Sequence, residues 1–411
     1  MWYSMNDLLL PAFPDNPVVI ASSSSKEYAP YLAVFLESIK DHMSNEKKYD
    51  FIIFESSWSD YLRDKFKKLY SSANFSIRFI NPEPYLGGRN LNISDSRFRR
   101  ECYYRLWAPI ILRNYKKILF TDIDLLAQGD ISLLLENDFL SDMTIAACID
   151  SSFEKAYQRG MSAGNINIRE YVDSVLKIKP DKYYNTGVLL IDVEKYIKAD
   201  VLSKILDLIS NNFFLYQEQC ALNSFFAEKI ATLPPEWNCQ INNGTIFDKE
   251  LNETYLNKIK TPKLYHYLGE NKVWYLPERE LSDIWWQYAR RTPFYEAILA
   301  NLMNYKNSKL RDEQIKLRSE QAKLSNDQAK LRDEQVKLKA EQAKLRSEQA
   351  KLSNDQAKLK SELREKEERK LFNRIKRKIY KTSLVFFPLN TRRRNVLKTI
   401  LRRSQNDNKK N

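Results

Sequence analysis

Residues 116–126 read KKILFTDIDLL, a short apolar run that leads into Asp122 and Asp124. The run predicts a buried strand that ends in the two acids, and alternate residues of a strand point to one face. Two carboxylates on one face can share a hard divalent cation, which would neutralise the charge of a diphosphate. A D-x-D pair alone arises by chance about once or twice in a chain of this aspartate content. Its place at the carboxyl end of a strand, where open α/β sheets bind ligands, makes both acids candidate metal ligands.

Further strands and helices alternate on both sides of this run. The predicted strands include residues 17–22 (PVVIAS), 49–56 (YDFIIFES), 75–80 (FSIRFI), 144–150 (TIAACID) and 185–192 (NTGVLLID). Helical spacing of apolar residues follows the first two, over residues 32–39 and 62–69. Strands that alternate with helices predict an α/β domain with a mostly parallel sheet. We expect this domain to span residues 17–303, after an N-terminal extension of residues 1–16.

The charge is unevenly distributed along the 411 residues. The formal net charge is +14, yet residues 364–411 alone hold 17 Lys and Arg against 4 Asp and Glu. The basic character belongs to this C-terminal segment, so we expect no nucleic-acid partner. The four cysteines form no C-x-x-C pair, which favours reduced thiols. Signal-peptide features and runs of 18 apolar residues are absent from the sequence, so we expect a cytoplasmic protein.

Residues 305–370 contain no Gly or Pro and repeat every seven residues, close to K-L-x-x-E-Q-A. The heptad leucines are Leu310, Leu317, Leu324, Leu331, Leu338, Leu345, Leu352 and Leu359. The pattern predicts a continuous helix of about 100 Å at 1.5 Å per residue. An unbroken seven-residue period favours a coiled coil, and with it a homo-oligomer. The alternative is a single solvated helix held by pairs such as Asp312 with Lys316, because Gln occupies the second seam position.

Residues 371–411 form a basic amphipathic tail. The apolar residues of its first half share one helical face and are Leu371, Phe372, Ile375 and Ile379. Basic amphipathic segments of this kind bind anionic membrane surfaces. The alternative is a disordered tail that binds any polyanion. The periodic spacing favours the membrane, which would place the protein peripherally on the inner face of the cytoplasmic membrane.

A second candidate site segment is HYLGENK, residues 266–272. His266 stands where a strand is predicted to end, and a neutral imidazole would complete a metal site with the two acids. Gly269 would let the backbone approach phosphates, and Lys272 would bring positive charge to them. The alternative is a half-buried histidine in a loop, since a lone histidine is not a metal signature.

Two more segments offer polar groups to a ligand. In YYNTGVLLID, residues 183–192, Asn185, Thr186 and Gly187 begin a predicted strand and could bond sugar hydroxyls. The alternative there is a simple turn before the strand. In YQEQCALN, Glu218 and Gln219 begin a predicted helix, where the alternative is a solvated first turn.

The chain resembles glycosyltransferase family 8 over about residues 17–275. The resemblance rests on an ordered set of segments: YYRLWAPIIL, ILFTDIDLL, ACID, YYNTGVLLID, YQEQCALN, LPPEWN and HYLGENKVW. The wording is most similar to that of the family's bacterial lipopolysaccharide galactosyl- and glucosyltransferases. The resemblance implies a GT-A fold, a UDP-sugar donor, Mn²⁺ (or Mg²⁺), a saccharide or glycolipid acceptor, and retention of the anomeric configuration.

The resemblance also implies roles for single residues. The matches to the family's metal ligands are Asp122, Asp124 and His266. The matches to its diphosphate-binding turn are Gly269 and Lys272. The matches to positions lining the donor sugar are Arg105, Asp122, Asn185, Thr186, Gly187, Glu218 and Gln219. Asp150 matches a position near the reacting sugar, and Tyr28 is the best match to the nucleotide-binding loop.

The catalytic candidates are Gln219, Glu218 and Asp150. A retaining enzyme often uses a carboxylate behind the anomeric carbon. The family lacks a well-placed one, so we favour front-face return, with the leaving phosphate taking the acceptor's proton. Gln219 would then lie beneath the sugar and stabilise positive charge. Two other functions are considered. One is a haloacid-dehalogenase-like phosphatase, whose motif has Thr or Val at the position of Leu126. The other is a catalytically degenerate coiled-coil membrane scaffold.

Overall fold

The computed structural model describes residues 9–15, 17–87, 100–241, 256–257, 259–269 and 272–386, with 392, 395, 396, 398 and 399. The chain divides into two compact units, Met1–Leu310 and Arg311–Asn411. The second half of the predicted tail, from residue 387 onward, lies almost wholly outside the described residues. All four cysteines are free, which confirms the prediction of reduced thiols.

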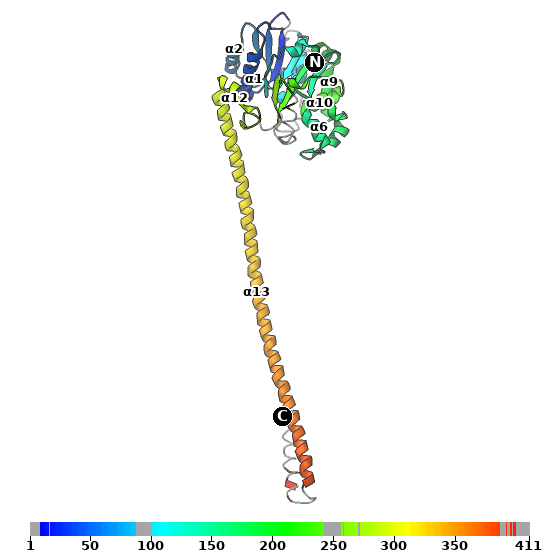
Figure 1. Ribbon diagram of the computed structural model, residues 1–411, viewed down its shortest axis with the longest axis vertical. Helices are drawn as coiled ribbons and strands as arrows, with labels where there is room; N and C mark the ends of the chain where they lie inside the picture. The colour runs from blue at the N-terminus through cyan, green and yellow to red at the C-terminus, as the bar shows by residue number, and fades with distance from the viewer. Residues whose placement is uncertain are drawn as a thin grey trace. The chain divides into compact units, whose positions relative to one another are not determined.

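A seven-stranded sheet forms the centre of the first unit (Figure 1). In spatial order its strands are β10 (Ala231–Thr232), β6 (Ile145–Ile149), β9 (Tyr184–Asp192), β4 (Lys117–Thr121), β1 (Val18–Ser23), β2 (Tyr49–Phe54) and β3 (Phe75–Ile80). Within the described sheet, β9 alone runs antiparallel to its neighbours, β4 and β6. The prediction of a mostly parallel α/β sheet is therefore confirmed.

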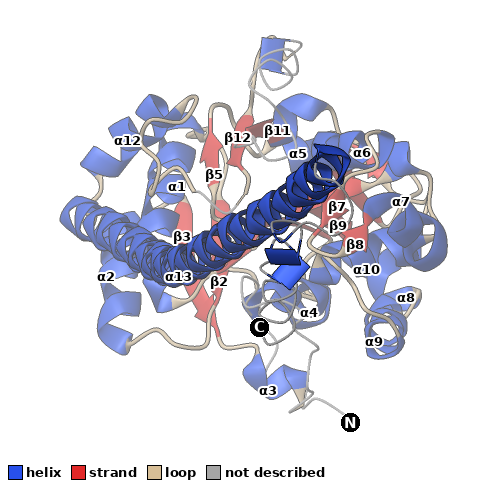
Figure 2. Ribbon diagram, turned by 90° about the horizontal axis from the view of Figure 1, so that it is seen from below, coloured by secondary structure: helices blue, strands red, loops and turns tan. Residues whose placement is uncertain are grey.

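Helices cover both faces of this sheet (Figure 2). The described helices of this unit are α1 (Ala29–His42), α2 (Asp60–Tyr70), α3 (Glu83–Leu86), α4 (Tyr104–Ile111), α5 (Leu133–Glu136), α6 (Ser151–Gln158), α7 (Ile168–Tyr171), α8 (Val193–Lys198), α9 (Val201–Asn211), α10 (Gln217–Phe226) and α12 (Ser282–Arg291). Successive strand residues alternate between two cores: Val19 packs with α4, α8 and α10, whereas Ile20 packs with α1 and α2. The sheet is thus buried on both faces, as its continuous apolar strands require.

A smaller sheet lies beside the large one and carries part of the site. Its strands, in order, are β11 (Cys239–Ile241), β12 (Leu264–Tyr267) and β5 (Leu125–Ala127). Strand β12 pairs antiparallel with β5, and His266 is opposite Leu125. A third core, which includes Trp274 and Trp285, packs this sheet against α1 and α12. A separate hairpin joins β7 (Ser162–Ala163) to β8 (Ile166–Asn167).

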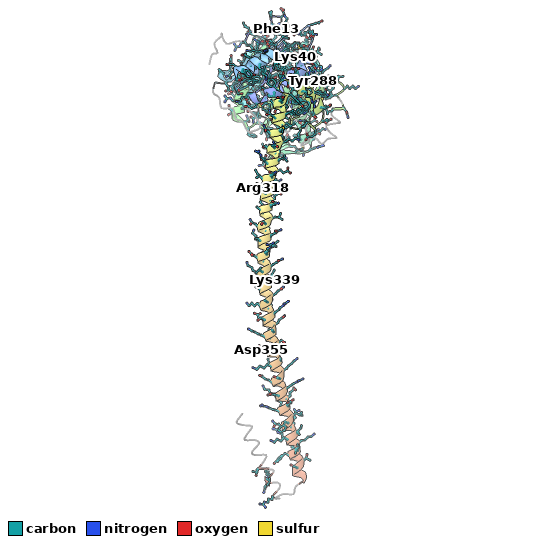
Figure 3. The ribbon with its side chains drawn as sticks, turned by 90° about the vertical axis from the view of Figure 1, so that its left-hand side faces the viewer. Phe13, Lys40, Tyr288, Arg318, Lys339 and Asp355 are labelled. Atoms are coloured by element: carbon teal, nitrogen blue, oxygen red, sulfur yellow. The ribbon has the colours of Figure 1, made fainter. Side chains whose placement is uncertain are left out.

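The heptad region is part of one long helix, α13 (Tyr295–Phe386), which extends beyond the predicted residues 305–370 at both ends. Every side chain from residue 306 to 375 is exposed, and the heptad leucines expose between 55% (Leu317) and 63% (Leu324) of their surface. Figure 3 shows side chains standing away from this helix along its length, among them Arg318, Lys339 and Asp355. Within the described residues, no helix is both long and apolar enough to cross a membrane. Coiled-coil formation stays a prediction.

Candidate active site

Asp122 and Asp124 lie where the chain passes from the large sheet to the small one. Strand β4 ends at Thr121, and β5 begins at Leu125 as part of the other sheet. The prediction that one strand carries both acids on one face is therefore wrong, because the two acids occupy the turn between two strands. The carboxylates still converge, since the chain leaves one sheet and enters the other at this point.

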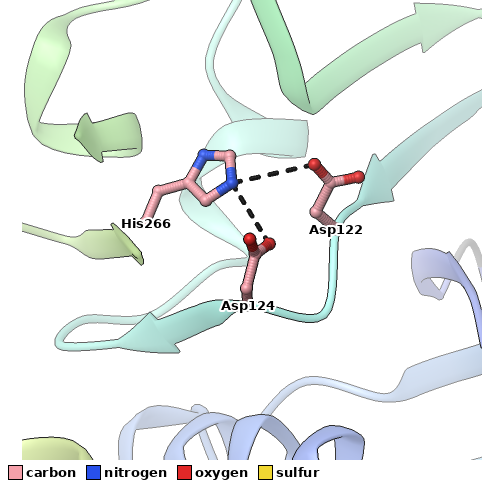
Figure 4. Close-up of side chains that lie close together, drawn as sticks. All are labelled: Asp122, Asp124 and His266. Atoms are coloured by element: carbon pink, nitrogen blue, oxygen red, sulfur yellow. Dashed lines mark ion pairs between the residues drawn. The ribbon is translucent and has the colours of Figure 1, made fainter. Parts of the chain in front are cut away.

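His266 completes a three-residue cluster from strand β12 (Figure 4). Its Nε2 lies 3.1 Å from Asp124 Oδ1 and 3.7 Å from Asp122 Oδ2. One ligand atom from each of the three residues lies within 4.8 Å of the others. His266 is only 1% exposed and belongs to a strand, so the alternative of a half-buried loop histidine is wrong.

The hydrogen bonds of His266 leave its Nε2 without a proton and facing the two acids. Asn185 Oδ1 accepts the backbone N–H of Gly187, so the Asn238 group that bonds this oxygen is its amide nitrogen. Asn238 Oδ1 then accepts a hydrogen bond from His266 Nδ1 at 2.8 Å. The proton of the neutral ring is therefore on Nδ1, which leaves Nε2 as a lone-pair acceptor.

This bare nitrogen tests whether the cluster fits a metal ion. His266 Nε2 is buried and has no hydrogen-bond partner among the described residues. A lone pair that faces two carboxylates is unfavourable unless a cation lies between them. One imidazole nitrogen and carboxylate oxygens are ligands that divalent ions such as Mn²⁺ accept. The three residues therefore fit a divalent cation.

Gly187 leaves the space in which the cluster forms. A Cβ at this position would lie 2.2 Å from His266 Cε1 and 2.9 Å from Asp122 Oδ2. Both contacts are far inside van der Waals distance, so a side chain here would displace the imidazole or the carboxylate. Gly187 reaches this place because β9 is antiparallel: the beginning of β9 lies beside the end of β4. The geometry places it against the metal cluster.

Each acid of the cluster forms an ion pair with a basic residue. Burial alone would raise the pKa of Asp124, but the ammonium group of Lys272 holds it well below its usual range. Lys272 Nζ forms an ion pair with Asp124 Oδ2. Arg105 is buried and binds Asp122 Oδ1 at 2.5 Å and the carbonyl oxygen of Thr186 at 2.5 Å. Asp124 is therefore ionised at neutral pH, as a metal ligand must be.

Glu218 and Gln219 begin α10 and are turned inward. Glu218 is 5% exposed, so the alternative of a solvated first turn is wrong. Its carboxylate lies 3.3 Å from Arg105 Nε. Burial raises the pKa of Glu218 to about 7, although Arg105 opposes the rise. The group is thus divided between its neutral and charged forms near neutral pH.

Gln219 is held by hydrogen bonds on both ends of its amide. Its oxygen accepts the backbone N–H of Thr186 at 3.0 Å. Its nitrogen donates to the hydroxyl of Tyr183 at 3.1 Å and to Asp150 Oδ2 at 3.5 Å. The sequence indicated Gln219 and Asp150 separately, and the structure brings them together with Thr186.

Asp150 and His266 are joined by a chain of hydrogen bonds through two asparagines. Asp150 Oδ1 caps α6 by accepting the backbone N–H groups of Ser152 and Phe153. Its Oδ2 accepts from Asn185 at 3.2 Å, and Asn238 continues from Asn185 to His266.

The sequence does not single out Asn238, which ends the family segment LPPEWN. It follows a Pro-Pro pair in a short 3₁₀ turn, Pro235–Asn238, and is fully buried. A polar residue at the end of a motif was the available signal. Its burial and its contact with the histidine were not visible in the sequence.

Two other predicted positions, Gly269 and Tyr28, have distinct local environments. Gly269 adopts a left-handed backbone conformation, with φ of 91°, three residues before Lys272. The ring of Tyr28 packs edge-on against Tyr31 and Trp274, with centroids 5.8 and 6.2 Å away. The structure therefore joins Lys272 to the cluster through Asp124 and places Tyr28 in an aromatic group packed against the third core.

Comparisons with known proteins give one family. The sequence model of the family described as Glycosyl transferase family 8 matches residues 19–276. General stress protein A of Bacillus subtilis (strain 168) is 22% identical over 274 residues, which cover 63% of this chain and 88% of that protein. The lipopolysaccharide glucosyltransferase WaaO of Escherichia coli (strain K12) is 22% identical over 261 residues, with coverages of 62% and 70%.

Solved structures agree with this match. The apo structure of the bifunctional glycosyltransferase WbbM has a TM-score of 0.64 and 25% identity, and the match covers 72% of this chain and 53% of that one. This chain thus spans about half of the WbbM chain. The galactosyltransferase LgtC, in complex with donor and acceptor sugar analogs, shares the fold with a TM-score of 0.54, 21% identity and coverages of 67% and 96%. Because the family match spans more than half of its residues, this chain belongs to glycosyl transferase family 8 and is a glycosyltransferase with a GT-A-like fold.

Proposed function

We propose that this chain is a retaining hexosyltransferase that moves galactose or glucose from a UDP-sugar to a saccharide or glycolipid acceptor. The pathway would be the synthesis of lipopolysaccharide, lipooligosaccharide or another surface glycan. The observation that carries the proposal is the cluster of Asp122, Asp124 and the unprotonated Nε2 of His266. Family membership argues against the phosphatase alternative, and the intact cluster disfavours a catalytically degenerate scaffold.

The residues of the cluster would hold Mn²⁺ or Mg²⁺. A divalent ion there would stabilise the charge that develops on the diphosphate as its bond to the sugar breaks. Lys272 and the backbone around Gly269 supply positive charge and close approach for the same phosphates. Arg105, Asn185 and Thr186 lie on the side of Glu218 and Gln219, where we place the donor sugar.

The side-chain contacts support front-face return over a covalent intermediate. Glu218 faces Arg105 and has a pKa of about 7, so it is a poor permanent nucleophile. Asp150 is committed to the helix cap and to Asn185. In our proposal the bond from the sugar to the phosphate breaks, the acceptor oxygen attacks the same face, and the leaving phosphate takes the acceptor's proton. Gln219, held by Thr186 and Tyr183, would stabilise the positive sugar.

The test is hydrolysis of a panel of UDP-sugars by the full chain, with and without Mn²⁺. We expect one UDP-hexose to be hydrolysed, and Asp124→Asn to lower the rate at least about a hundredfold. Asp138→Asn, which removes an exposed acid of the same domain, is the matched control. If no UDP-sugar is bound or hydrolysed, the donor assignment is wrong and the catalytically degenerate scaffold becomes the better description.

The basic tail supports a place on the inner face of the cytoplasmic membrane. In the described part of the tail, Leu371, Phe372 and Ile375 are exposed apolar residues among Lys and Arg. We expect the full chain to sediment with vesicles that contain anionic lipid and the chain without residues 371–411 to stay in solution. Neutral phosphatidylcholine vesicles are the control. Binding to heparin without binding to anionic vesicles would favour the disordered polyanion-binding tail.

The exposed heptad leucines of α13 support self-association of the chain. A repeated apolar residue every seventh position is the pattern that two or more helices bury against one another. Sedimentation of the full chain as a monomer at micromolar concentration would leave the single solvated helix as the better description.

A further inference from the structure

The charges beside the heptad leucines decide how two copies of α13 can pair. In a coiled coil written abcdefg, the a and d residues form the seam, and e and g flank it. With the leucines at d, the residue four positions later is a, which is Gln in seven heptads and Leu363 in the last. The residue three positions later is g, and it is Glu or Asp in all eight heptads. The residue one position later is e, and it is Arg, Lys or Ser.

In a parallel pair these charges attract one another. A g residue of one helix lies beside the e residue five positions later on its partner, so Glu313 meets Arg318 and Glu334 meets Lys339. Of the seven such pairs between residues 313 and 360, five join an acid to a base and two join an acid to Ser. In the described helix all of these side chains are exposed and available to a partner.

In an antiparallel pair the same charges repel one another. There g lies beside g and e beside e, so acids would face acids along the whole seam, and bases would face bases or Ser. The apolar residues are also mismatched, because antiparallel packing sets d opposite a. Full overlap would place Leu317 against Gln356, a leucine against a polar amide. Parallel packing instead sets leucine on leucine in every d layer.

We infer that α13 binds a second copy of this chain in a parallel, in-register coiled coil. The register follows from the leucines: residues 316–330 repeat identically at 344–358, but a shift of 28 residues would leave four of the eight leucine layers unpaired. Both transferase domains would then precede the same end of the paired helices, and both basic segments would follow the other. The inference rests on the self-association in the proposed function and adds its direction and register.

Three variants of the full chain, each with one added cysteine, test this arrangement. Leu317→Cys should form a disulfide-linked dimer on oxidation, because parallel in-register packing places the two Leu317 positions opposite each other. Tagged Leu317→Cys mixed with untagged Gln356→Cys reports antiparallel pairing, and mixed with Leu345→Cys reports the 28-residue shift. The unsubstituted chain gives the background from the natural cysteines. We expect the first disulfide and neither mixed one.

Each outcome is decisive. A mixed disulfide with Gln356→Cys or Leu345→Cys overturns the direction or the register while leaving self-association intact. An oligomer in sedimentation without the Leu317→Cys disulfide also overturns the inference. A monomer removes self-association altogether, and UDP-sugar hydrolysis by the same sample reports separately on the transferase assignment.

Charge reversal gives an independent readout with a matched control. Glu313→Lys with Glu334→Lys sets two bases against Arg318 and Lys339, so dimer association should weaken about tenfold or more. Asp312→Lys with Asp333→Lys makes the same change in net charge one residue away, on the outer face, and should leave the association constant within about threefold. Equal weakening by both pairs would show that the acids act through net charge and not across a parallel seam.

Discussion

The transferase domain buries several of its polar side chains, whereas the long helix of this chain exposes them. In the domain, Asp124, Glu218 and His266 are almost completely buried, and their geometry is set by neighbours from distant parts of the chain. In α13, every side chain from residue 306 to 375 is exposed. The domain therefore contains its own partners, whereas the helix presents a repeated pattern whose partner, in our proposal, is a second copy of the chain.

This contrast separates two kinds of functional information. A buried polar group destabilises the fold unless it forms hydrogen bonds or ion pairs. Its position is therefore fixed by its partners, and a small displacement disturbs these contacts. An exposed helix tolerates substitution at most positions and responds only where the seam is formed. Changes in the site should thus have large effects on activity, and changes in the helix should alter assembly alone.

The largest effect should come from Gly187→Ala. The added Cβ would lie 2.2 Å from His266 Cε1, so the imidazole must move out of the cluster. Because a misplacement of about 1 Å can cost about a hundredfold, we expect kcat/KM for UDP-sugar hydrolysis to fall about a hundredfold or more.

Gly129→Ala is the control for the cost of an added methyl group. Its nearest contact is the flexible side chain of Lys263, which can move aside. If both variants lose the same activity, the space that Gly187 leaves for the imidazole of His266 has no special role.

A smaller effect should follow from Asn238→Ala. The substitution removes the acceptor that holds the proton on His266 Nδ1. Loss of such a supporting group commonly costs 10- to 100-fold in metal affinity, and we expect about that rise in the Kd for Mn²⁺, measured by calorimetry. Asn137→Ala, in an exposed position, should leave the Kd unchanged. An unchanged Kd for Asn238→Ala would mean that the ring is oriented by packing alone.

The next effect is on the pH dependence of stability. The pKa of Glu218 is about 7 in the folded chain, above its ordinary value of 4.5. The stability linked to this group is therefore fully present below pH 4.5 and is lost as pH rises through 7. In metal-free chain, Glu218→Gln should reduce the loss of unfolding free energy between pH 5 and 8 by about 2 kcal/mol.

Denaturant melts at several pH values measure this difference, with Glu46→Gln, an exposed acid, as the control. If the unfolding free energies of Glu218→Gln and of the unsubstituted chain change equally with pH, the raised pKa of Glu218 is contradicted.

The smallest effect on activity should come from ending the chain after Leu310, where the compact unit ends. The family match ends at residue 276, so the site is complete without the rest of the helix. We expect kcat for UDP-sugar hydrolysis within about twofold of the full chain, and a monomer in sedimentation. A large loss of kcat in a folded fragment would show that the helix acts on the site, and the contrast between the two regions would not hold.

Much of the fold was visible in the sequence because its signals are local. The strands predicted at residues 49–56 and 75–80 and the helix predicted over residues 32–39 follow from apolar spacing, and the structure has them as β2, β3 and α1. The break inside KKILFTDIDLL was not visible. An apolar run does not show that its two halves belong to different sheets, since that is decided by which strands pair with them.

By itself, the sequence determined six of the seven strands of the large sheet, the candidate acids at Asp122 and Asp124, and the seven-residue period of the helix. These features depend on neighbours within a few residues. Only the tertiary structure decided that His266 faces the acids through Nε2, that Asn238 fixes its proton, and that Gly187 leaves the space. Those facts depend on the pairing of β12 with β5 and of β9 with β4, which join residues far apart in the chain.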